Sequence, residues 1–200
     1  MIGLLLAKRH PTVSVTGVEL QPELARHAAA NARSNALNDR CLIIRGDLRD
    51  APRFLPQEHY HQVVANPPFR RPGSGATPPD PGRASARLEL SFTLTDLART
   101  TSALLRFGGT LSVIHLSERL PELCRVLEDA GLTPKKLRLI GTRATAPPRL
   151  CLVSAIKGGR PGLSVLPQLS LHEPGGRYTE AVAAMLGDGN AEKPEKVKKH

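Results

Sequence analysis

The sequence predicts an α/β fold, with an open and mostly parallel sheet covered by helices on both faces. Short β-branched segments alternate with helical segments through most of the 200 residues, which is typical of such sheets. Polar residues also follow three predicted strands where each strand ends, and 40% hydrophobic residues are enough for one core. We expect one domain over residues 1–186 and a disordered basic tail at 187–200.

The first half of the chain alternates helix and strand. Pro22 favours a helix start, and the alanines that follow it share one face. β-Branched residues before Glu19 indicate a strand that ends there. The expected elements are a helix at 2–8, a strand at 13–18, a helix at 22–35, a strand at 41–44, a short helix at 51–55 and a strand at 62–65.

The second half opens with a loop rich in Pro, Gly and Ser at 70–82. Leucines at intervals of three and four then predict a long helix that ends before Gly108-Gly109. The expected elements are this helix at 90–104, a strand at 110–116, a helix at 118–130, and strands at 137–141 and 150–156. The last two strands are expected to be antiparallel, because no helix-length segment separates them. Val165 and residues 178–186 are expected to form a small appendage.

The charge and the cysteines limit the possible functions. A formal net charge of +10 favours a polyanionic partner such as nucleic acid. The three cysteines lack metal-ligand or disulfide spacing, and they are expected to be free thiols. No metal is implied, because no histidine has ligand spacing. Without an 18-residue apolar run or a cleavable leader pattern, we expect an intracellular protein with no membrane span.

Polar side chains stand at three strand ends, where ligands of such sheets bind. Glu19 has the place of an acidic residue that accepts hydrogen bonds from ribose hydroxyls, although a surface carboxylate or a helix cap before Pro22 is an alternative. That acidic residue follows a glycine-rich turn by about 20 residues. We therefore expect the turn and its strand to precede Met1. Asp47 either accepts from an adenine amine or caps the following turn.

The most specific pattern is Asn66-Pro67-Pro68-Phe69, which follows the strand at 62–65. Two prolines fix the backbone direction and remove two donors, so the chain leaves the sheet with its carbonyls in a set orientation. The Asn66 oxygen, a rigid carbonyl and an aromatic ring can then hold a planar amine, with two acceptors for its two hydrogens and one ring for stacking. The alternative is that the prolines only end the strand and Phe69 fills the core.

These residues together resemble the class I S-adenosylmethionine-dependent methyltransferases that carry an Asn/Asp-Pro-Pro-Phe/Tyr motif and methylate planar nitrogens. Two segments, RASARLELSFTLTDLARTTSALLRFGGTLSVIH (83–115) and GRYTEAVAAML (176–186), make the chain most similar to the bacterial adenine-N6 methyltransferases of tRNA1(Val). The resemblance covers about residues 1–186. It implies a Rossmann-like sheet, S-adenosylmethionine as cofactor and an anticodon-adjacent adenine of tRNA as substrate.

The resemblance also implies roles for individual residues. The residues that correspond to the family's cofactor site are Glu19, Leu20, Asp47, Leu48 and Asn66. Those that correspond to its catalytic motif are Asn66, Pro67, Pro68 and Phe69, with the Pro67 carbonyl toward the target amine and the Phe69 ring stacked on the flipped base. Those expected to meet RNA phosphates, or alternatively to form only a solvated basic loop, are Arg70, Arg71, Arg83 and Arg87.

The family's first strand and its D-x-G-x-G-x-G turn are missing from the sequence. We therefore expect an N-terminally shortened domain that binds the cofactor poorly. Enzymes that methylate release-factor glutamine, rRNA guanine N2 or DNA adenine remain alternatives. The first of them carries Tyr where this chain has Phe69, and this difference, together with the charge of +10 and the terminal YTEA, favours an RNA substrate. An alternative of another class is a basic RNA-binding module without catalysis.

Overall fold

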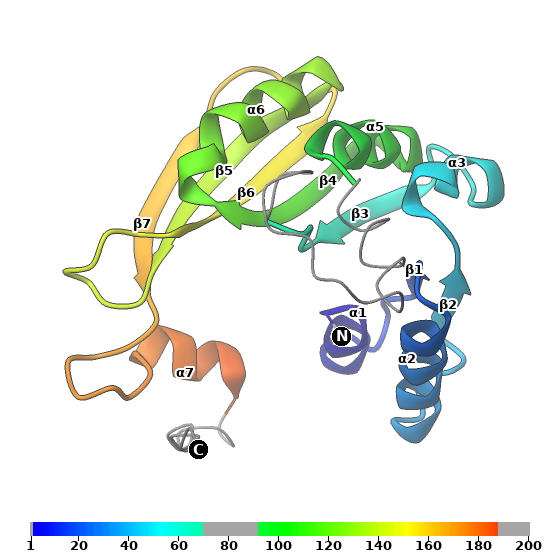
Figure 1. Cartoon of the computed structure of the whole chain (residues 1–200), viewed down its shortest axis with the longest axis horizontal. Helices are drawn as coiled ribbons and strands as arrows, with labels where there is room; N and C mark the ends of the chain where they lie inside the picture. The colour runs from blue at the N-terminus through cyan, green and yellow to red at the C-terminus, as the bar shows by residue number, and fades with distance from the viewer. Residues whose placement is uncertain (1, 70–91, 188–200) are drawn as a thin grey trace, which may run out of the picture.

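The computed structural model describes residues 2–69 and 92–187 (Figure 1). The predicted loop from residue 70 to 82 and nearly all of the predicted tail lie outside them. No helix within the described ranges combines the length and apolar character needed to cross a membrane. The elements are α1 (Ile2–Arg9), β1 (Val15–Glu19), α2 (Pro22–Ser34), β2 (Cys41–Arg45), η1 (Leu48–Asp50), α3 (Ala51–Phe54), β3 (Tyr60–Ala65), α5 (Leu94–Leu104), β4 (Leu105–Leu116), η3 (Ser117–Arg119), α6 (Leu120–Asp129), β5 (Leu132–Gly141), β6 (Leu150–Lys157), β7 (Ser164–Ser170) and α7 (Glu180–Leu186).

The described strands form two separate sheets. The larger has five strands in the order β3-β4-β6-β5-β7, and the smaller consists of β1 and β2 in parallel. β3 runs parallel to β4, while β6 runs antiparallel to β4 and β5, so the predicted antiparallel closing pair is confirmed. Among the described residues, β1 and β3 each pair on one side only, and they do not pair with each other.

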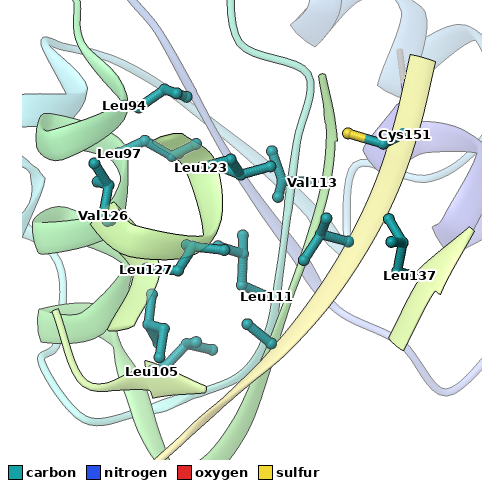
Figure 2. Close-up of a cluster of buried hydrophobic side chains, with 14 residues drawn as sticks. Leu94, Leu97, Leu105, Leu111, Val113, Leu123, Val126, Leu127, Leu137 and Cys151 are labelled. Carbon is teal, nitrogen blue, oxygen red and sulfur yellow. The ribbon is translucent and has the colours of Figure 1, made fainter. Parts of the chain in front are cut away.

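The main core lies between the five-stranded sheet and two helices. Figure 1 shows α5 and α6 together over one face of this sheet. α6 buries Leu123, Val126 and Leu127, whose spacing of three and four places them on one face of the helix. In Figure 2 Leu97 of α5 and Leu123 and Leu127 of α6 lie toward the sheet. They face Leu111 and Val113 of β4, and all of these side chains are buried. Each fully buried leucine contributes about 1.5–3 kcal/mol of transfer free energy.

A second, smaller core joins α1 and α2 to the two-stranded sheet. It consists of Ala7, Ala32, Leu37 and Cys41, with Leu4 and Val15 packed against it. Arg40 closes this unit, because its Nη1 donates to the carbonyl oxygens of Ala7 and Val13, each at 3.0 Å, and to that of His10 at 3.3 Å. The side chain of Leu48 packs against the main core, so η1 connects the two units.

Two element predictions are wrong in part. The predicted helix does end before Gly108-Gly109, at Leu104, but the strand that follows begins at Leu105 and not at Thr110, so both glycines lie inside β4. A Cβ on Gly109 would come within 3.0 Å of the Tyr60 carbonyl oxygen, so glycine lets β4 approach β3 closely. Val165 does not lie in an appendage, because β7 pairs in parallel with β5 as the last strand of the larger sheet.

Candidate active site

The Asn66–Phe69 motif lies at the carboxyl end of β3, as predicted. The strand's last residue, Ala65, pairs with Val113 of β4, and the chain then leaves the sheet. Asn66 and Pro68 are exposed, Pro67 is buried, and Phe69 is partly buried. The motif is therefore anchored by its first proline, with the amide of Asn66 open to solvent.

Phe69 is held at both its backbone and its ring. The Nη1 of Arg119 donates a hydrogen bond of 3.2 Å to the carbonyl oxygen of Phe69. The ring lies edge-on to the imidazole of His115, with 5.5 Å between the ring centroids and 76° between the planes. Such an edge-to-face pair is a favourable arrangement of two aromatic rings. Phe69 could stack on a base or fill the core, and these contacts are compatible with both roles because part of its surface stays exposed.

His115 is a buried polar residue beneath the motif. Its side chain has no exposed surface, and neither ring nitrogen has a hydrogen-bond partner among the residues that the structure describes. Burial lowers the pKa of this imidazole, and the positive charge of Arg119 lowers it further. The imidazole is therefore neutral at neutral pH. Sequence reasoning missed His115, although it continues the inward alternation of Leu111 and Val113 in β4.

Glu19 lies beside the end of β2. Its carbonyl oxygen accepts from the backbone N–H of Gly46 at 3.0 Å, which places Asp47 next to it. One carboxylate oxygen of Glu19, Oε1, accepts from the backbone N–H of Gln21 at 2.9 Å. Within the described part of the chain no donor reaches Oε2, so this oxygen is open to a ligand hydroxyl.

Asp47 caps the turn that follows β2. Its Oδ1 accepts from the backbone N–H of Arg49 at 2.9 Å, and its Oδ2 accepts from Nη2 of the same arginine at 2.5 Å. These contacts with Arg49 hold the pKa of the Asp47 carboxyl below its usual range. Asp47 is expected either to cap the turn or to accept from an adenine amine, and in the structure it caps the turn. An adenine amine would have to share the carboxylate with Arg49.

The structure brings some of the predicted site residues together but not all. Glu19, Leu20 and Asp47 belong to the smaller sheet and its loops, whereas Asn66 and Phe69 belong to the larger sheet. Leu48 packs against the larger core. The predicted RNA-binding residues lie outside the described residues: Arg70, Arg71, Arg83 and Arg87.

Comparisons with known proteins agree with this fold. Residues 1–77 match the family model "Methyltransferase small domain". A tRNA1(Val) (adenine(37)-N6)-methyltransferase of Porphyromonas gingivalis is 33% identical over 147 residues, which are 72% of this chain and 54% of the relative. A crystal structure of a predicted O-methyltransferase from Agrobacterium tumefaciens superposes with a TM-score of 0.73 and 26% identity, covering 98% of this chain and 86% of that one. The chain therefore has a Rossmann-like methyltransferase fold.

This methyltransferase fold confirms the predicted α/β class. A Yersinia enterocolitica protein with the same tRNA1(Val) methyltransferase name is 27% identical over 192 residues, or 94% of this chain and 73% of the relative. The chain spans about half the length of the Porphyromonas relative, 54%. The comparisons therefore show a methyltransferase fold, and the reaction and substrate of this chain are the subject of the proposal below.

Proposed function

We propose that this chain transfers a methyl group from S-adenosylmethionine to the N6 amine of an adenine beside the anticodon of tRNA. The observation that carries the proposal is the position of Asn66–Phe69 at the carboxyl end of β3. Ligands of open α/β sheets bind at this edge. Relatives named tRNA1(Val) adenine-N6 methyltransferases support the choice of adenine and of tRNA.

The motif supplies the groups that an exocyclic amine needs. Asn66 offers an exposed amide oxygen, and the carbonyl of Pro67 offers a second acceptor on a backbone fixed by two prolines. Two acceptors on the N6 hydrogens favour a pyramidal nitrogen whose lone pair can attack. Phe69 presents its exposed ring surface to the base.

S-adenosylmethionine supplies an electrophilic methyl group, and the electron pair of the broken carbon–sulfur bond stays on sulfur. The protein's part is to place the acceptor nitrogen in line with that bond, and correct placement alone accounts for large rate enhancements. Glu19 would bind the ribose through Oε2, and Asp47 with Leu48 would border the adenine. The N6 proton leaves to solvent, so no buried catalytic base is needed.

The charge of the chain fits an RNA substrate. The formal net charge is +10, and Arg70, Arg71, Arg83 and Arg87 follow the motif in the sequence. Phosphate contacts from such residues give affinity that decreases with salt. A target in a single-stranded loop lowers the few kcal/mol that base flipping costs.

Transfer of tritiated methyl groups tests the proposal. The chain is incubated with labelled S-adenosylmethionine and, separately, with tRNA, 16S rRNA, DNA and a release factor, and the modified nucleoside is identified after digestion. We expect label in tRNA as N6-methyladenine, at a low rate because the shortened domain is expected to bind the cofactor poorly. Asn66→Ala should lower this rate by a further factor of at least about 100, because its acceptor is gone. Asn38→Ala, at another exposed asparagine, should transfer at the wild-type rate.

Other outcomes separate the alternatives. If the label appeared in rRNA, DNA or the release factor and not in tRNA, the labelled molecule would be the substrate and the proposal of tRNA would be wrong. Salt-sensitive binding of tRNA with no binding of S-adenosylmethionine in calorimetry would support a basic RNA-binding module and overturn the proposed reaction.

A further inference from the structure

Arg119 joins the helical layer to the Asn66–Phe69 motif from 50 residues away in sequence. It lies at the end of η3, which follows β4 directly. Its side chain is only 11% exposed, so the guanidinium is held inside the protein and does not extend into solvent. The one contact that it makes with the described part of the motif is to the carbonyl oxygen of Phe69.

Glu122 fixes the orientation of this guanidinium. Nε of Arg119 donates to Oε2 of Glu122 at 3.0 Å, and Nη2 donates to Oε1 at 2.7 Å. Two parallel hydrogen bonds of this kind hold the planar group in a single orientation. The third nitrogen, Nη1, is then directed at Phe69, with an N to O distance of 3.2 Å.

We propose that Arg119 is a positioning residue, which fixes Phe69 for stacking on the target base. The ring of Phe69 rests against His115, and the backbone of Phe69 is tied to Arg119, so the ring is restrained from two neighbouring elements. Only the ring surface left exposed remains for a ligand. This inference rests on the proposed function for its substrate, whereas the restraint of Phe69 rests on its contacts with His115 and Arg119.

A tryptophan reporter tests the restraint without any substrate. The chain has no tryptophan, so Phe69→Trp introduces a single fluorophore at the motif. In that background we expect Arg119→Ala to raise the acrylamide quenching constant about threefold, because the indole is no longer held. Glu122→Gln, which keeps the shape but weakens the bidentate pair, should raise it less. Lysine cannot bind Glu122 bidentately and reach Phe69 together, so Arg119→Lys should resemble Arg119→Ala.

Arg125→Ala is the matched control. Arg125 lies on α6, is 71% exposed and pairs only loosely with Asp129 at 3.7 Å. Its removal also takes one arginine from the same region, but it should leave quenching unchanged. Circular dichroism of each variant shows whether the fold is kept. If Arg119→Ala does not fold, Glu122→Gln is used in its place to test the restraint. Quenching that stays at the Arg125→Ala level in every Arg119 and Glu122 variant would overturn the proposal.

Methyl transfer, measured in the chain with native Phe69, tests the consequence for catalysis. We expect Arg119→Ala to lower kcat roughly tenfold or more while changing the affinity for S-adenosylmethionine less than twofold, because misplacement of a reacting group acts on the transition state. Equal kcat in wild type and Arg119→Ala would overturn the positioning role. Altered quenching together with no transfer by the wild type would leave the restraint of Phe69 established and show that the proposed function is wrong.

Discussion

Thr93 and Asp96 cap each other across the first turn of α5. The Oγ1 of Thr93 accepts from the backbone N–H of Asp96 at 3.1 Å, and Oδ2 of Asp96 accepts from the backbone N–H of Thr93 at 3.0 Å. This reciprocal capping box satisfies two donors that a helix start otherwise leaves without partners. It fixes where α5 begins, directly before the buried Leu94 and Leu97 of the main core.

Loss of this cap should destabilise the protein by a measurable amount. We expect Thr93→Ala to lower the free energy of unfolding by about 1 kcal/mol, within a range of about 0.5–2. Thr93→Ser keeps the hydroxyl and should cost only a few tenths of that amount. Urea unfolding followed by circular dichroism measures both variants, and equal stability of the alanine and serine variants would contradict the prediction.

If Asp47 borders the adenine, replacing Asp47 and replacing Arg49 should change the affinity for S-adenosylmethionine in different ways. Asp47→Ala removes an acceptor and should weaken S-adenosylmethionine binding about tenfold, the loss of one charge-assisted hydrogen bond. Arg49→Ala removes the guanidinium and leaves only the backbone N–H of residue 49 on Oδ1, so it should bind the cofactor at least as tightly as the wild type. Calorimetry measures both.

Arg53→Ala is the control for this pair, because Arg53 lies nearby and makes a more exposed ion pair with Asp50 at 3.1 Å. If Arg49→Ala weakened binding as much as Asp47→Ala, the two residues would act as one structural unit and Asp47 would not be a ligand to the adenine.

His115 should make stability depend on pH. Burial first, and Arg119 second, lower its pKa in the folded protein, while its unfolded pKa is about 6.5. Below about pH 6.5 the unfolded chain binds a proton at this site that the folded protein does not, so stability falls as pH decreases toward the folded pKa. Glu122 opposes this effect, and the neighbouring Cys151 stays protonated.

Replacement by a residue that does not titrate isolates this contribution. Between about pH 7 and pH 5, wild type should lose more unfolding free energy than His115→Asn, measured in urea at each pH. The other histidines are present in both proteins and cancel in the difference. If unfolding free energy fell equally with pH in both proteins, His115 would have the same pKa in the folded and the unfolded state, and the prediction would be wrong.

Cys151 should be unreactive while the protein is folded. It is fully buried, and burial raises the pKa of its thiol to about 11. At about pH 8 only about one part in a thousand would be thiolate, which is the reactive form. Iodoacetamide followed by peptide mass spectrometry should leave Cys151 unmodified in buffer and modify it fully in guanidinium chloride. Modification in buffer at the rate of a free thiol would contradict this burial.

Local patterns predicted the elements that carry their own signals. Pro22 marks the start of α2, and the inward leucines of α6 were recognised from their spacing. The motif at Asn66 was placed correctly at a strand end, because two prolines cannot continue a sheet.

Features that depend on distant partners could not be predicted in this way. β7 is mostly exposed and contains Pro167, so its strand character comes from its pairing with β5 and not from its own alternation. The contact of Arg119 with Phe69 joins residues 50 positions apart, and no spacing rule reports it. The sequence also could not predict that Asp47 accepts hydrogen bonds from Arg49, because a carboxylate that caps a turn and one that binds a ligand occur in the same sequence pattern.

The separation of β1 from β3 divides the described strands into two sheets whose cores differ in size. No described backbone hydrogen bond joins these strands, and the core of the smaller unit has only four buried residues, Ala7, Ala32, Leu37 and Cys41. Amide protons of β1 and β2 should therefore exchange with deuterium through local opening, before those of β4 and β6. A bound molecule that touched Glu19 and Asn66 at once would connect the two units. The cost of restraining their relative motion would reduce its affinity.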